Sequence, residues 1–105
     1  MIMRIANIYV HGKLAGVFEE LDQARKYRFV YLHDYDGPPI SLTMPVRESG
    51  YQFDRFPPFF DGLLPEGPML EGLLRQRKID GHDYFSQLVA VGQELVGAVT
   101  VEEKK

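Results

Sequence analysis

The chain has 105 residues, 45% of them hydrophobic and 26% charged, which fits one folded domain over residues 1–105 and excludes disorder. Its formal charge of −3 argues against a nucleic-acid-binding domain, because such domains carry clustered Lys and Arg. The absence of cysteine excludes disulfides and cysteine-ligated zinc. Since no long apolar run or signal-peptide pattern occurs either, we expect a cytoplasmic location without membrane contact.

The first part of the chain predicts a β-hairpin. Residues 5–10 and 14–18 are rich in apolar side chains and flank His11 and Gly12, two residues typical of a turn. This pattern predicts a hairpin over residues 4–19. Residues 19–25 are mostly polar, and we expect a loop or a single helical turn there.

Further strands are expected before residue 54. Residues 27–32 alternate with a period of two, which predicts a third strand. Residues 34–39 are dense in turn formers. Residues 40–44 and 51–53 are each expected to form a short strand.

Helical signals replace the strand pattern after residue 57. Pro58 suits the first turn of a short helix. From Pro68 to about Arg77, apolar residues at helical spacing predict a second helix, which Gly72 weakens by about 1 kcal/mol relative to alanine. The apolar residues of the first helix are expected to lie mainly in the core: Phe59, Phe60, Leu63 and Leu64.

One more helix and a strand complete the predicted fold. Asp80 is the expected N-cap of a helix with apolar residues between Tyr84 and Val91, and Gly92 is the expected C-cap. Residues 96–101 predict a closing strand, after which the charged tail is expected to fray. The order of elements predicts an α+β domain, in which two or three helices precede the last strand of a small antiparallel or mixed sheet.

Motifs for catalysis or metal binding are missing from the sequence. Its three histidines, His11, His33 and His82, lack the spacing of metal ligands. Neither Ser41 nor Ser86 lies in a G-x-S-x-G elbow, and the phosphate-binding and catalytic motifs of kinases do not occur. We therefore expect no catalytic residue, metal or cofactor. A small hydrolase using His33 or His82 is the minor alternative.

Residues 56–70 have the most unusual composition in the chain, with prolines, glycines and aromatics close together. Prolines fix φ and glycines allow positive φ, so a rigid corner is expected. The charged Glu66 and the irregular backbone predict that residues 65–68 form an exposed, stiff loop. Stiff loops suit binding because they lose little conformational entropy on docking. The expected partner-binding residues are Pro65, Glu66, Gly67, Pro68, Met69, Leu70 and Glu71.

Several pieces of the sequence follow the order found in one family. The most specific is Phe59-Phe60-Asp61-Gly62-Leu63-Leu64-Pro65-Glu66-Gly67, and weaker pieces are residues 10–16, 29–31, 40–45, 83–88 and 96–99. In these pieces the chain resembles the N-terminal subdomain of HipA-like serine/threonine kinases, the toxins of bacterial toxin–antitoxin systems. In those kinases the catalytic core follows the subdomain, whereas this sequence ends with a charged tail. The resemblance therefore implies a free-standing version.

Free-standing versions occur in three-component systems, and the chain resembles their HipS-type antitoxins. This resemblance implies that the partner is a HipT-like kinase toxin, accompanied by a helix-turn-helix DNA-binding protein of the HipB type. We expect the chain to dock on the N-lobe of the kinase and to present residues 65–71 near the nucleotide or substrate cleft. Some relatives carry a bulky aromatic after the loop; here Met69 or Leu70 is expected to replace it.

Two other interpretations of the resemblance remain open. The chain is either a structural subunit, which completes the kinase or links it to the DNA-binding protein without inhibiting it, or a fragment of a full kinase. Kinase assays separate the structural subunit from the inhibitor, and the gene context identifies a fragment. No direct contact with nucleic acid is expected in any of these cases.

Overall fold

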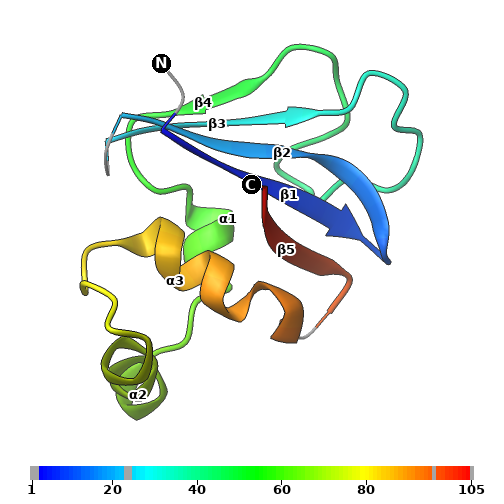
Figure 1. Cartoon of the computed structure of the whole chain (residues 1–105). Coiled ribbons are helices and arrows are strands. Elements are labelled where there is room, and N and C mark those ends of the chain that lie inside the picture. Colours follow the sequence, from blue (N-terminus) through cyan, green and yellow to red (C-terminus); the bar gives the residue numbers. More distant parts are fainter. Residues whose placement is uncertain (1–2, 23–24, 96, 105) are drawn as a thin grey trace.

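The computed structural model describes residues 3–22, 25–95 and 97–104. Within them an open sheet of five strands, in the order β4-β3-β2-β1-β5, lies above the helices (Figure 1). The α+β class is confirmed, and the pairing is antiparallel throughout this sheet. The strands are β1 (Arg4–Val10), β2 (Lys13–Asp22), β3 (Lys26–Tyr31), β4 (Tyr51–Phe53) and β5 (Val99–Lys104). The helices are α1 (Pro58–Asp61), α2 (Gly67–Arg77), α3 (Tyr84–Val91) and the short 3-10 helix η1 (Gly92–Glu94).

The predicted N-terminal hairpin is confirmed. His11 and Gly12 have positive φ values of 51° and 79°, which lets the chain reverse tightly between β1 and β2. Ala6 of β1 lies opposite Phe18 of β2, and both are fully buried. Ala6, Ile8 and Val10 alternate with less buried residues along β1, and this alternation sets the face of the sheet that meets the helices.

β2 is longer than the sequence indicates. It continues to Asp22, so the loop or turn expected at residues 19–25 is wrong for residues 19–22, while residues 23–24 lie outside the described ranges. Glu19 lies opposite Arg28 of β3, and the Arg28 Nε donates to its carboxylate at 2.6 Å. This cross-strand pair stabilises a strand in a stretch whose polar composition is typical of a loop.

The connection between β3 and β4 differs from the prediction. No strand forms at residues 40–44; Ser41 and Met44 make only an isolated bridge, in which the Met44 amide donates to the Ser41 carbonyl at 3.0 Å. The buried Tyr31 hydroxyl holds both sides of this turn, because it accepts from the Ile40 amide at 3.0 Å and donates to the Met44 carbonyl. A core side chain, rather than a neighbouring strand, therefore fixes the backbone here.

An aromatic cluster joins the sheet to the helices. Phe18 of β2 stacks on Phe60 of α1, with ring centroids 4.2 Å apart, and on Phe85 of α3 at 5.7 Å. Each such pair contributes about 1 kcal/mol beyond the burial of its area. The first helix is shorter than predicted because it ends at Asp61. Among the four expected core residues Phe60 is fully buried, and the others are half-buried against the cluster: Phe59, Leu63 and Leu64.

Helix α3 begins at a different cap from the one predicted. The N-cap is Asp83, whose carboxylate accepts from the Ser86 amide at 3.1 Å. Asp80, the expected cap, accepts instead from the His82 amide at 2.7 Å in the preceding turn. Gly92 is the C-cap as predicted, but its φ of −55° is right-handed and leads directly into η1.

β5 extends further toward the C-terminus than predicted. The strand runs through Lys104, which pairs with Ile5 of β1, so the expected fraying is wrong for residues 102–104. Val96, the expected first residue of this strand, and Lys105 lie outside the described ranges. In the described part of the chain, no helix is both long and apolar enough to cross a membrane.

Candidate partner-binding surface

The expected partner-binding residues, 65–71, lie where the chain leaves α1 and enters α2. The loop is shorter than predicted, because α2 already begins at Gly67, whose φ is 59°, and Pro68 lies in its first turn. Glu66 is the N-cap residue, and its side chain makes no capping hydrogen bond. Pro65 and Leu70 are half-buried, whereas the other five residues of the segment are exposed.

Helix α2 stands off the body of the domain. Figure 1 shows it beyond α1 and α3, away from the sheet, and none of its residues is buried. Met69 is 76% exposed, whereas the apolar side chains of a surface helix usually face a core. Because it buries none of its residues, α2 leaves its surface available for contact with another molecule.

A hollow of about 340 Å³ opens beside Met69. Sequence reasoning missed it, because the hollow forms only when three separate segments meet. One signal was available: Leu95 directly follows the exposed Glu94, and Leu63 and Met69 each lie two positions from an exposed acidic residue. The wall is formed by Gly62, Leu63, Pro65, Met69, Val91, Glu94 and Leu95.

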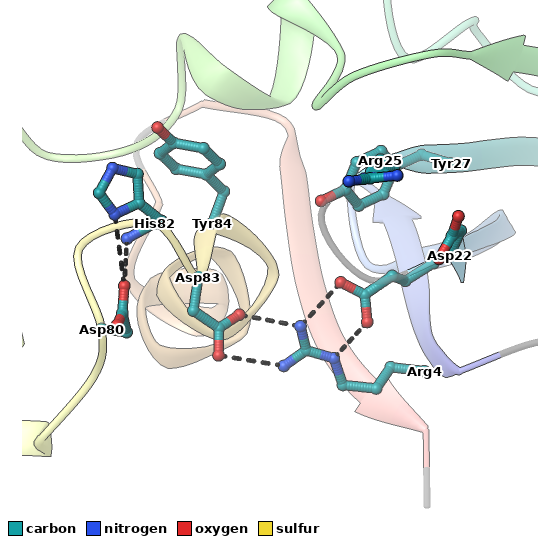
Figure 2. Close-up of a pocket in the computed structure, with 9 residues that line it drawn as sticks. Arg4, Asp22, Arg25, Tyr27, Asp80, His82, Asp83 and Tyr84 are labelled. Atoms are coloured by element: carbon teal, nitrogen blue, oxygen red, sulfur yellow. Dashed lines mark hydrogen bonds and ion pairs between the residues drawn. The ribbon is translucent and has the colours of Figure 1, made fainter.

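A polar pocket of about 550 Å³ lies on another side, where the sheet meets the N-terminus of α3 (Figure 2). Arg4 donates from Nε and Nη2 to the Glu20 carboxylate at 2.7 and 2.9 Å. Its Nη2 also reaches Asp83 at 2.8 Å, and its Nη1 donates to the Ser86 hydroxyl at 2.7 Å. Because the guanidinium is committed to these contacts, we interpret it as a clip between the sheet and α3.

The same contacts shift the pKa values of the groups in this pocket. The hydrogen bond to Glu20 is the main reason that the pKa of Arg4 lies above its ordinary value. Burial opposes ionisation of Asp83, but hydrogen bonds from Arg4 and Ser86 outweigh it and hold the pKa of Asp83 below 3.8. Burial also raises the pKa of Tyr27, in the pocket wall, to about 12. Near neutral pH the clip is therefore an ion pair beside an uncharged tyrosine.

Among the described residues, neither His33 nor His82 is hydrogen-bonded to Ser41 or Ser86. His33 lies 3.2 Å from an exposed glutamate and His82 lies 3.6 Å from an exposed aspartate. The Ser41 hydroxyl lies beside a threonine, and the Ser86 hydroxyl donates to Asp83 at 2.7 Å. Among the residues described, no three side chains of the metal-binding types gather. These contacts give the hydrolase alternative no support.

A second exposed apolar side chain lies in the connection between β3 and β4. Leu42 is 97% exposed, at the turn held by Tyr31. Figure 1 shows this connection well apart from α2. The exposure of Leu42 was missed because a strand was predicted for residues 40–44. The available signal was a single leucine between Ser41 and Thr43, next to a stretch dense in turn formers.

Comparison with known proteins identifies the family. The family described as HipA N-terminal domain matches residues 6–102. The chain belongs to this family. A solved structure titled N-terminal domain of HipA toxin is 27% identical, with a TM-score of 0.76 over 100% of this chain and 96% of that one. The resemblance inferred from the sequence motifs is thereby confirmed, as is the fold.

Relatives of two kinds match the chain. An uncharacterized protein of Haemophilus influenzae is 32% identical over 99% of this chain and 96% of its own length. Two putative kinases of Sinorhizobium fredii are 28% and 26% identical over 92% and 94% of this chain. The chain spans only 26% and 24% of the length of these two kinases. The domain thus has relatives of its own size and relatives that are much longer.

Proposed function

We propose that this chain is an antitoxin, which binds and inhibits a HipT-like serine/threonine kinase in a bacterial toxin–antitoxin system. Membership of the HipA N-terminal domain family supports a kinase-associated role. The observation that carries the proposal is the position of α2, which has no buried residue and displays Met69. A helix that contributes so little to its own core is available to a partner.

Inhibition follows from where residues 65–71 dock. In the proposed complex the domain contacts the N-lobe of the kinase, and this segment lies near the nucleotide or substrate cleft. Pro65 and Pro68 limit the conformational entropy lost on docking. Met69 packs adaptably, which suits it to an apolar site on the kinase. The segment then blocks substrate entry sterically or holds the phosphate-binding loop in an unproductive state.

Co-expression with a HipT-like kinase from the same organism tests the proposal. We expect co-purification of the two proteins and relief of the growth arrest caused by the kinase. The variant Met69→Asp should lose both effects, whereas Met3→Asp, at a second exposed methionine outside α2, should keep them. Failure of the unchanged chain to co-purify or to relieve the arrest contradicts the proposal.

A bridging subunit is the alternative that the exposure of Leu42 favours. Leu42 and Met69 are both exposed. The β3–β4 connection and α2, which carry them, lie well apart (Figure 1), so this function has the chain bind two proteins at once. In this function the chain links the kinase to the HipB-like DNA-binding protein without lowering kinase activity. A stable ternary complex with undiminished kinase activity, disrupted by Leu42→Asp, supports this alternative over the antitoxin.

A further inference from the structure

The hollow beside Met69 has walls whose backbone is held in place. After α1, the Gly62 amide donates to the Pro58 carbonyl at 3.0 Å, and the Leu63 amide donates to Phe60 at 3.1 Å. Pro65 fixes its own φ. A volume of about 340 Å³ leaves room for a whole side chain, since one water occupies about 30 Å³ of liquid.

The surroundings of the hollow are acidic. Residues 56–74 and 84–95, which supply its walls, contain no Lys, Arg or His. They contain four acidic residues, Asp61, Glu66, Glu71 and Glu94, all of which are exposed. None of the ion pairs found among the described residues involves these four carboxylates. Glu94 lines the hollow itself, and Asp61, Glu66 and Glu71 lie one or two positions along the chain from other lining residues, so we interpret the four as an acidic rim.

We infer that this hollow receives an apolar side chain of the partner protein, flanked in that protein by Lys or Arg. An apolar centre within a charged rim is the usual composition of a protein interface. The rim repels nucleic acid and anionic membranes, because both carry negative charge. The inference rests on the proposed kinase partnership and adds the chemistry of the kinase segment that makes the contact.

Two properties of binding follow from this arrangement. The acidic rim speeds the encounter with a basic segment, and salt weakens this effect by screening. The apolar recess holds the anchor after docking, so it governs the dissociation rate. Changes to the rim and to the recess should therefore alter different rate constants.

The rim is tested with purified chain and a HipT-like kinase from the same organism, by measuring association rates at low and high ionic strength. We expect the double variant Glu66→Lys/Glu94→Lys to associate at least about tenfold more slowly at low salt, with a much smaller difference at high salt. The matched control is Asp34→Lys/Glu48→Lys, which reverses two exposed acids between β3 and β4. It should change the rate by no more than about twofold.

The recess is tested by filling it without changing charge. Gly62 lines the hollow, has a φ of −65°, and has room for a Cβ at ordinary contact distance. Gly62→Leu should raise the dissociation rate about tenfold, with an unchanged circular dichroism spectrum and melting temperature. If the unchanged chain binds the kinase but neither variant alters its rate constant, this inference is wrong and the proposed function stands. If the unchanged chain does not bind, both are wrong.

Discussion

The guanidinium of Arg4 donates to the carboxylate of Asp83 at 2.8 Å, across 79 positions of sequence. This contact ties β1 to the N-cap of α3, and Figure 2 shows Arg4 pointing toward Asp83 across the pocket. The far end of α3 contributes Val91 to the hollow beside Met69. The clip therefore helps to position the candidate binding surface from the opposite end of the helix.

Removing Arg4 should destabilise the fold. In Arg4→Ala, the Glu20 carboxylate, whose side chain is 3% exposed, loses two charge-assisted hydrogen bonds. We expect the free energy of unfolding to fall by about 2 kcal/mol, measured by urea denaturation. Lys13→Ala, which breaks an exposed ion pair, should leave the free energy nearly unchanged. Equal losses in the two variants would contradict the role of the clip.

The clip also predicts how stability depends on pH. The pKa of Asp83 is lower in the folded state than its ordinary value of 3.8, so the unfolded state binds more protons as the pH falls. The stabilisation is present above the ordinary pKa and is lost as the pH drops through the folded-state value. The free energy of unfolding is measured from about pH 7 down to about pH 3 for the unchanged chain and for Asp83→Asn. The difference between the two chains should be largest at neutral pH and should shrink as the pH falls. Parallel pH profiles for the two chains contradict this explanation.

Truncation should reduce the free energy of unfolding strongly at Phe60 and hardly at all at Met69. Phe60 is fully buried against Phe18, and Phe60→Ala is expected to cost about 3–5 kcal/mol of unfolding free energy. Met69 is exposed, so Met69→Ala should change the free energy by no more than about 0.5 kcal/mol. Thermal melts of both variants check the division of this segment into core and surface. A large loss of stability in Met69→Ala contradicts it.

Two glycines offer a second matched comparison. A Cβ on Gly92 would lie 2.0 Å from the Val101 carbonyl oxygen of β5, so Gly92→Ala should destabilise the domain by about 1–3 kcal/mol. A Cβ on Gly72, inside α2, would meet no atom within 4 Å. Gly72→Ala should therefore stabilise the chain by about 0.5–1 kcal/mol through helix propensity. Chemical denaturation measures the free energy of unfolding of both variants. Destabilisation by Gly72→Ala would contradict the open surroundings of Gly72 in α2.

Local patterns in the sequence were sufficient for much of the fold. The hairpin, the helices and the α+β class follow from periodicity and turn residues that act over a few positions. The errors occur where distant partners decide the outcome. Glu19 continues β2 because Arg28 lies opposite, and Lys104 is ordered because Ile5 pairs with it. The Tyr31 hydroxyl holds the turn at residues 40–44, which no local propensity could indicate.

The candidate site could be predicted only in part. Proline, glycine and a charged residue close together predicted the exposure of residues 65–68. Glu66, Gly67 and Pro68 are exposed, whereas Pro65 is half-buried. The hollow could not be predicted, because Leu63, Met69 and Leu95 meet only after α1, α2 and α3 have packed. The early start of α2 at Gly67 was also missed, since glycine is usually a helix terminator rather than its first residue.

Phosphorylation by a HipT-like kinase from the same organism, measured while this chain is titrated in, tests the central claim most directly. We predict that kinase activity falls to background at equimolar chain. Met69→Asp should restore the activity, while Met3→Asp should inhibit as well as the unchanged chain does. A stable complex with full kinase activity at saturating chain would contradict the antitoxin function.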